Sequence, residues 1–151
     1  MIEINNLTTV EVDENFLKGI ISKVLKGEKI QKEVELSIAC IGSGRMRKLS
    51  RQYRGKNRVT DVLAFPESEI VFQKFKIGPL KKIKGLGEIV ICLKEVKKNS
   101  RRFESSFEKE LARVLVHGLL HLLGYDHEGS EKKAKEMEEK QEKYLLEILK
   151  S

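Results

Sequence analysis

The chain has 151 residues and a formal net charge of +7, from 30 lysines and arginines against 23 aspartates and glutamates. This length predicts one domain, residues 1–151, built around a single hydrophobic core. No apolar run reaches the roughly 18 residues that a membrane span requires, and no signal-peptide pattern opens the sequence, so we expect a cytoplasmic protein without membrane association. The basic excess favours a polyanionic partner such as nucleic acid.

The first half of the chain predicts short strands separated by two helices. Alternating apolar residues indicate strands at residues 1–5, 34–41 and 60–65. Asp13 is placed to cap the first helix, which ends near Gly27. A second helix follows the turn at residues 42–44 and carries the apolar positions Met46, Leu49 and Tyr53.

The second half predicts a long connection, one buried strand and three helices. Residues 67–85 are rich in lysine and are expected to form a loop or a loose hairpin, with a strand following at residues 86–92. A polar helix then runs to about Arg102, and Ser105 or Ser106 caps a long apolar helix. The charged terminal helix, within residues 130–150, carries a narrow docking stripe of Ala134, Met137, Gln141, Leu145 and Ile148.

All three histidines of the chain fall within residues 117–127. His117 and His121 are four residues apart, so on a helix they lie on the same face. Gly124 is placed where the helix must end, because a residue without Cβ adopts the left-handed C-cap conformation, and the chain then returns His127 to the same point. Three imidazoles with an open fourth position are typical of a catalytic zinc site, which predicts one Zn²⁺ per chain.

Ordinary core histidines are the alternative interpretation of this cluster. The surrounding segment, Leu111–Leu123, is apolar almost all the way round, which indicates a central and buried helix. Placing two imidazoles in such a helix without strong partners would cost about 1–3 kcal/mol each. A metal ion supplies that partner, so we favour the metal site.

The spacing of His117, His121, Gly124 and His127 is similar to that of the metzincin peptidases. Those enzymes place a glutamate directly after the first histidine as the general base, whereas this chain has Gly118. A zincin-like metallopeptidase is therefore an alternative interpretation, for which this chain lacks the usual general base.

The same segment, HGLLHLLGYDH, closely resembles the signature of the YbeY family of single-strand-specific endoribonucleases. Further blocks of that family are matched by Tyr53–Lys56, Thr60–Pro66 and Leu86–Ile91. The match runs from about residue 36 to residue 128. It departs from the family pattern at Val59, Ala64 and Glu88, where proline, serine and aspartate are usual.

The resemblance implies both a fold and a function. The fold expected is α+β, with a small mixed four-stranded sheet packed against helices, zincin-like, around a buried central metal-binding helix. The activity expected is zinc-dependent cleavage of single-stranded RNA, in 16S rRNA 3′-end maturation and ribosome quality control, with the ribosome or ribosomal proteins as partners. A second alternative is a non-catalytic ribosome-assembly factor that uses the metal for stability.

The resemblance also assigns roles to residues. The catalytic residues expected are His117 and Arg54, whose guanidinium can hold a phosphate through two parallel hydrogen bonds. Asp126 either orients a ligand imidazole from behind or caps the turn. Metal-activated water and the RNA 2′-OH both remain open as the nucleophile, and no general base is identified. The RNA-binding residues expected form one basic stretch, Arg45, Arg47, Lys48, Arg51, Arg54 and Lys56, whose alternative is a solvated helix face.

The two cysteines have no metal-ligand spacing. Cys40 and Cys92 each lie in an apolar, strand-like stretch. We therefore expect two core thiols and no disulfide.

Overall fold

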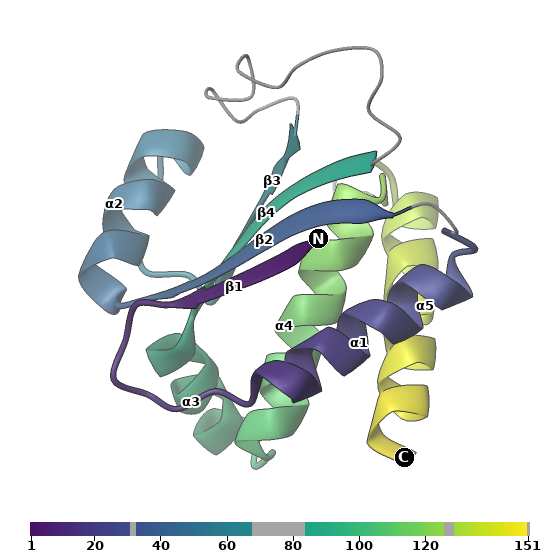
Figure 1. The fold of residues 1–151 in the computed structure, drawn as a ribbon. Coiled ribbons are helices and arrows are strands. Elements are labelled where there is room, and N and C mark those ends of the chain that lie inside the picture. The colour runs from purple at the N-terminus through teal and green to yellow at the C-terminus, as the bar shows by residue number, and fades with distance from the viewer. Residues whose placement is uncertain (31–32, 68–83, 126–128, 151) are drawn as a thin grey trace.

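The computed structural model describes residues 1–30, 33–67, 84–125 and 129–150 (Figure 1). Within these ranges the elements are β1 (Ile2–Asn6), α1 (Glu14–Gly27), β2 (Val34–Ile41), α2 (Ser43–Arg54), β3 (Val62–Pro66), β4 (Lys84–Cys92), α3 (Leu93–Arg102), α4 (Phe107–Leu122) and α5 (Glu131–Lys150). The expected lysine-rich connection falls mostly outside the described residues.

The strands form one mixed sheet in the order β1-β2-β4-β3. β1, β2 and β4 are parallel, and β3 lies antiparallel to β4 at one edge. Helices α1, α3, α4 and α5 lie on one side of the sheet and α2 on the other (Figure 1). The predicted α+β class with a mixed four-stranded sheet is confirmed.

The main core lies between the sheet and helices α1 and α4. Helix α4 is its centre, because Leu111, Leu115 and Leu119 are almost completely buried. Each such side chain contributes about 1.5–3 kcal/mol to folding. The prediction of a buried central helix is therefore confirmed. The side chains on the less buried side of α4 are attached to a helix that core packing holds in place.

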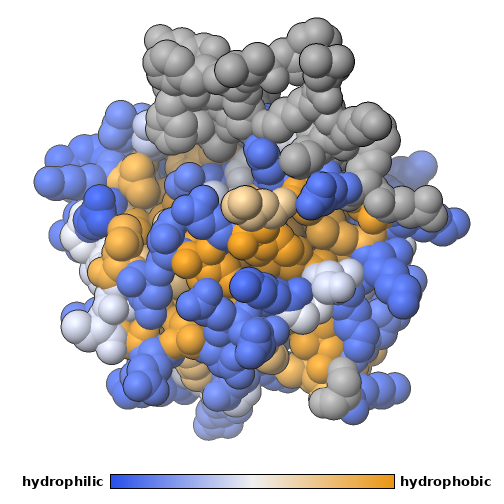
Figure 2. Space-filling model, in the orientation of Figure 1, coloured by the Kyte–Doolittle hydropathy of each residue, from blue (hydrophilic) through white to orange (hydrophobic). Residues whose placement is uncertain are grey.

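A smaller core lies under α2, on the opposite face of the sheet. It consists of Ile41, Met46, Leu63, Val90 and Cys92. Figure 2 shows the molecule from the sheet edge at β1, with hydrophilic residues around an apolar centre. One short helix thus covers this face, and its anchor is the fully buried Met46.

The helix caps were predictable from the sequence. The Asp13 carboxylate accepts hydrogen bonds from the backbone N–H groups of Asn15 and Phe16, at 3.0 and 3.2 Å, and so caps α1. Ser106 is the residue that caps α4, because its hydroxyl accepts from the N–H of Lys109 at 3.0 Å. Both bonds satisfy N–H groups that a helix leaves unpaired.

Some details differ from the sequence prediction. β4 begins at Lys84, so the last two residues of the predicted connection 67–85 belong to a strand. β3 begins at Val62 rather than at residue 60, and it includes Pro66, which pairs with Gly87. Proline, which has no backbone N–H, is tolerated there because β3 is an edge strand and needs no donor on its outward side. Tyr53 is 53% exposed, and its ring packs edge-on against Phe65 with centroids 5.1 Å apart.

Both cysteines are free and buried, as predicted. Burial raises the pKa of the Cys40 thiol to about 11, so this thiol stays protonated at neutral pH. Among the described ranges, no helix combines the length and apolar character needed to cross a bilayer.

Candidate active site

A cavity of about 290 Å³ opens between the C-terminal end of α2, β3, α4 and α5. Its apolar wall comes from β3, through Val62, Leu63 and Ala64. Its polar lining includes the two α4 histidines, the end of α2 with the following loop, and one side chain of α5. Segments far apart in the sequence therefore meet at this one recess.

His117 and His121 both line the cavity from α4. They are half-buried, and their ring centroids are 6.0 Å apart with the planes inclined at 67°. The prediction that this pair shares one helix face is confirmed. The third predicted ligand, His127, and the predicted supporting residue, Asp126, lie outside the described residues.

Helix α4 ends as its sequence predicts. Gly124 has a φ of +104°, in the region that favours glycine. Its N–H donates to the carbonyl of His121 at 3.1 Å, and the N–H of Tyr125 donates to that of Leu120 at 3.0 Å. These two bonds form a Schellman motif, which stops the helix directly after the second histidine and turns the chain.

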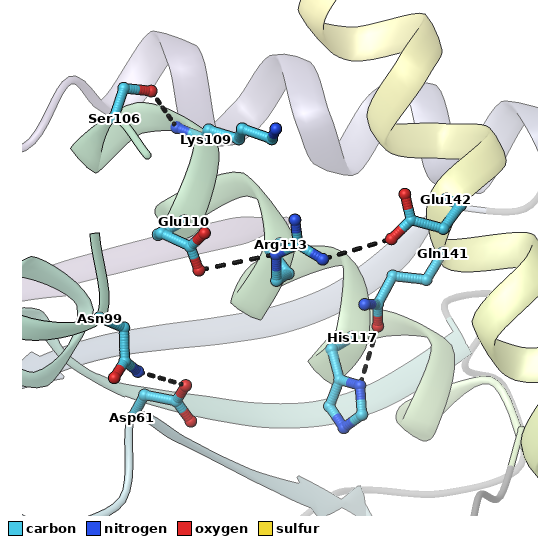
Figure 3. Close-up of polar contacts among 9 residues, drawn as sticks. All are labelled: Asp61, Asn99, Ser106, Lys109, Glu110, Arg113, His117, Gln141 and Glu142. Carbon is cyan, nitrogen blue, oxygen red and sulfur yellow. Dashed lines mark hydrogen bonds and ion pairs between the residues drawn. The ribbon is translucent and has the colours of Figure 1, made fainter. Parts of the chain in front are cut away.

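Within the described ranges no group of three possible metal ligands comes together, and the two α4 histidines are the cavity side chains whose chemistry suits zinc. Imidazole nitrogens are preferred zinc donors, and here two of them face one recess from adjacent turns of a buried helix. The Nδ1 atom of His117 is 2.9 Å from the amide oxygen Oε1 of Gln141 on α5 (Figure 3). Support of this kind behind a ligand ring is common in metal sites.

Gly118 explains why the helix can pass so close to the sheet. A Cβ atom built on this buried glycine would lie 3.2–3.4 Å from the side chain of Ile89, which is completely buried in β4. The position that carries the glutamate base in metzincins is therefore crowded here. This packing is a physical reason against the peptidase alternative.

The predicted basic residues divide into two groups. Arg54 is the last residue of α2, and the chain turns at Gly55, whose φ is +64°. This turn brings Arg54, Lys56 and Arg58 to the rim of the histidine cavity, where all three are exposed.

The other basic residues of α2 point elsewhere. Arg45 and Lys48 line a separate groove, against the sheet residues Glu88 and Val90. Arg51 donates to the side chain of Asn57 at 3.0 Å, and Arg47 is exposed on the helix. The basic stretch is therefore not one continuous surface along the cavity.

Asp61 also lines the cavity, although no pattern in the sequence predicted a role for it. Burial raises the pKa of its carboxyl, against the opposing effect of backbone N–H groups and the nearby His117. The carboxylate also accepts a hydrogen bond from Asn99 at 3.3 Å (Figure 3), and the Asp61 carbonyl accepts from the N–H of Cys92 at 2.8 Å. Asp61 thus ties the start of β3 to the end of β4 and to α3.

Arg113 is a second cavity residue that was missed. It lies one turn before His117, and its guanidinium contacts Glu110 on its own helix at 3.6 Å and Glu142 on α5 at 3.2 Å (Figure 3). Glu110 is only 5% exposed, so part of this network is shielded from water. The network joins α4 to α5 beside the histidines.

Comparison with known proteins decides the family. The family model described as endoribonuclease YbeY matches residues 3–149. The chain belongs to the YbeY family. The endoribonuclease YbeY of Caldanaerobacter subterraneus subsp. tengcongensis is 38% identical, with 89% of both chains covered. That of Sulfurihydrogenibium sp. is also 38% identical, over 88% of this chain and 82% of the relative.

A solved structure agrees with this assignment to the YbeY family. The solution structure of TM1509 from Thermotoga maritima is 35% identical in sequence. The match covers 98% of this chain and 89% of TM1509, with a TM-score of 0.63. The family resemblance predicted from the sequence blocks is thus confirmed over nearly the whole chain.

Proposed function

We propose that this chain is a zinc-dependent endoribonuclease that cleaves single-stranded RNA. One Zn²⁺ per chain would be held by His117, His121 and His127. The observation that carries the proposal is that the α4 histidine pair and the cations Arg54, Lys56 and Arg58 line the same cavity. Nitrogen donors for a metal and positive charge for phosphates are what a metal-dependent nuclease requires.

Each wall of the cavity has its own part in the reaction. The chemistry that a zinc ion held there would supply is Lewis acidity at the phosphate and a lowered pKa of water, to near neutral pH. Arg54 orients the scissile phosphate through two parallel hydrogen bonds and offsets the charge that develops on its oxygens. Lys56 and Arg58 bind the adjoining phosphates, while Val62–Ala64 form the apolar wall.

The size of the recess supports a single-stranded substrate. A volume of about 290 Å³ is near the lower end for small-molecule pockets, which are about 300–1,000 Å³. A recess of this size accepts one nucleotide unit of a strand that is free to bend. Single-stranded segments expose such units, whereas a rigid duplex does not.

The decisive experiment combines metal analysis with RNA cleavage. We expect purified protein to contain one equivalent of zinc and to cut an end-labelled single-stranded RNA but not its duplex. His121→Ala should lose both the metal and the cleavage. A variant that keeps a full equivalent of zinc would refute the ligand assignment, and undiminished cleavage by His117→Ala would indicate a contaminating nuclease.

The same preparations separate the two alternatives. A metallopeptidase would degrade an unfolded protein such as casein in a zinc-dependent manner, and we expect no such degradation. A non-catalytic assembly factor would lose thermal stability in His117→Ala while the wild type cut no RNA. RNA cleavage by the wild type but not by His117→Ala would exclude a non-catalytic assembly factor.

The family resemblance is the support for a proposed cellular substrate. We propose cytoplasmic action on ribosomal RNA, in 16S rRNA 3′-end maturation and ribosome quality control, with the ribosome or ribosomal proteins as partners. Incubating ribosomal particles that carry unprocessed 16S rRNA with the protein should shorten the 3′ end. Unchanged 3′ ends, in a preparation that cuts free RNA, would argue against this substrate.

A further inference from the structure

Gln141 is the polar member of an otherwise apolar helix face. Met137 precedes it by one turn and Leu145 follows it by one turn, and these side chains are 1% and 3% exposed. Residues four apart share a helix face, so the packing that seats α5 on the molecule also directs Gln141 inward. Its side chain is half-buried and lines the histidine cavity.

The Gln141 amide reaches one ring nitrogen of His117. Oε1 of Gln141 is 2.9 Å from Nδ1, and Figure 3 shows the side chain extending from α5 to the ring on α4. In this orientation of the amide, Oε1 only accepts, so the contact requires the tautomer with the proton on Nδ1 and the lone pair of the neutral ring on Nε2. Free neutral histidine favours the opposite tautomer, and this contact therefore selects the less common one.

A neighbouring ion pair holds the two helices at the same level. Arg113 lies one turn before His117, and Glu142 directly follows Gln141. Their side chains meet at 3.2 Å (Figure 3). The amide contact and the ion pair thus lie next to each other between α4 and α5.

We propose that Gln141 is a positioning residue for the metal centre. It fixes the tautomer and the rotation of the His117 ring before any metal arrives, so that binding does not require the ring to reorganise. The proposal deepens the function proposed above, on whose metal site it rests. Sequence spacing alone gives Gln141 no such role.

The first test measures the tautomer in metal-free protein. Long-range ¹H–¹⁵N spectra at alkaline pH distinguish a protonated Nδ1 from a protonated Nε2, and the His117 signals are those that His117→Ala removes. We expect Nδ1–H in the wild type and in Gln141→Glu, which keeps an acceptor. Gln141→Met, of similar length but without an acceptor, should shift the ring towards Nε2–H.

The second test measures zinc affinity by competition with a chelator. Gln141→Met should bind about 10–100-fold more weakly, as expected when the partner behind a ligand ring is lost. Gln141→Glu should restore binding to at least the wild-type level. Glu139→Met, at an exposed position of the same helix, is the matched control and should bind as the wild type does.

The outcomes are distinguishable from failure of the nuclease proposal. Neither readout uses RNA, so a protein that cuts no RNA but shows both shifts keeps the role of Gln141. Gln141→Met that retains the wild-type tautomer and zinc affinity would overturn that role, whatever the cleavage. Should the Met variant not fold, Gln141→Ala removes the acceptor with a smaller side chain and gives the same comparison.

Discussion

The two polar walls of the cavity are built by opposite means. On α4, the histidines stand on a helix whose other faces are buried, and a side chain of α5 contacts one of the rings. On the α2 side, Arg54 and the cations after it are exposed and lie around a glycine turn. A metal ligand must be held to a fraction of an ångström, whereas long cationic side chains reach a phosphate from many positions. Rigidity is therefore concentrated where the chemistry demands it.

The largest expected effect is a loss of stability when a larger side chain is introduced on α4, the rigid wall of the cavity. Gly118→Glu pushes a Cβ against the buried Ile89 and adds a carboxylate beside the core, which should lower the free energy of unfolding by about 2–4 kcal/mol. Gly19→Glu on α1 is the matched control, because nothing lies within 4 Å of its Cβ position. Denaturant unfolding measures both. Equal stability of the two variants would show that α4 has room against the sheet.

A substitution on the exposed α2 side of the cavity should change activity rather than stability. Arg54→Ala removes a donor to the developing phosphate charge, so we expect kcat to fall by about 10²–10³-fold with zinc content and Tm unchanged. Arg54→Lys keeps the charge but not the paired hydrogen bonds, and it should recover only part of the rate. Unaltered turnover in Arg54→Ala would remove this residue from the site.

The Glu28 carboxylate, which contacts the turn after His121, should make the stability of the fold depend on pH. Glu28 accepts hydrogen bonds from Tyr125 at 2.6 Å and from Tyr144, and Lys140 lies 3.2 Å from it. Burial alone would raise the pKa of Glu28, but these three partners outweigh it and lower the pKa below the ordinary value of a glutamate. A carboxyl whose folded pKa is depressed stabilises the fold above its unfolded pKa, and this stabilisation is lost as the pH falls through the folded pKa.

Glu28→Gln tests this contribution. We expect the variant to be less stable by about 1–3 kcal/mol at neutral pH and to lose less stability than the wild type as the pH falls through the pKa of Glu28. Thermal unfolding across this pH range measures the difference, and Glu139→Gln on the exposed face of α5 is the control. Parallel pH profiles for wild type and Glu28→Gln would contradict the assignment.

The smallest effect separates the two groups of cations. Lys56 lines the histidine cavity and Lys48 lines the other groove, although both are exposed lysines of one basic stretch. Lys56→Ala should reduce RNA affinity several-fold and lower the salt dependence of binding by about one charge, whereas Lys48→Ala should change little. Equal losses would mean that RNA covers the whole of α2.

The features that the sequence predicted are those set by neighbours along the chain. The histidine pair on one helix face, the Asp13 and Ser106 caps and the Gly124 turn each depend on residues within one turn of each other. Local chemistry determines such features, so the pattern alone was sufficient.

What the sequence did not predict depends on packing between distant segments. The partner of His117 is 24 residues away, and the hydrogen bond between Tyr144 and Glu28 spans 116 residues. Gln141 and Tyr144 take part only because α5 docks with one rotation about its axis. The division of the α2 cations likewise follows from the face on which Met46 is buried. The periodicity of the docking stripe places Gln141 on the inward face of α5, but it does not specify which residues of other elements that face contacts.

The burial of both native thiols gives the molecule a practical property. Cys40 and Cys92 are the only cysteines in the chain, and neither side chain is accessible to solvent. A cysteine introduced on α2 at Arg47 or at Lys48 would therefore be the one site open to maleimide chemistry in the native state. A photoreactive or fluorescent group could be attached there without first removing either native thiol, at a position away from the histidine cavity.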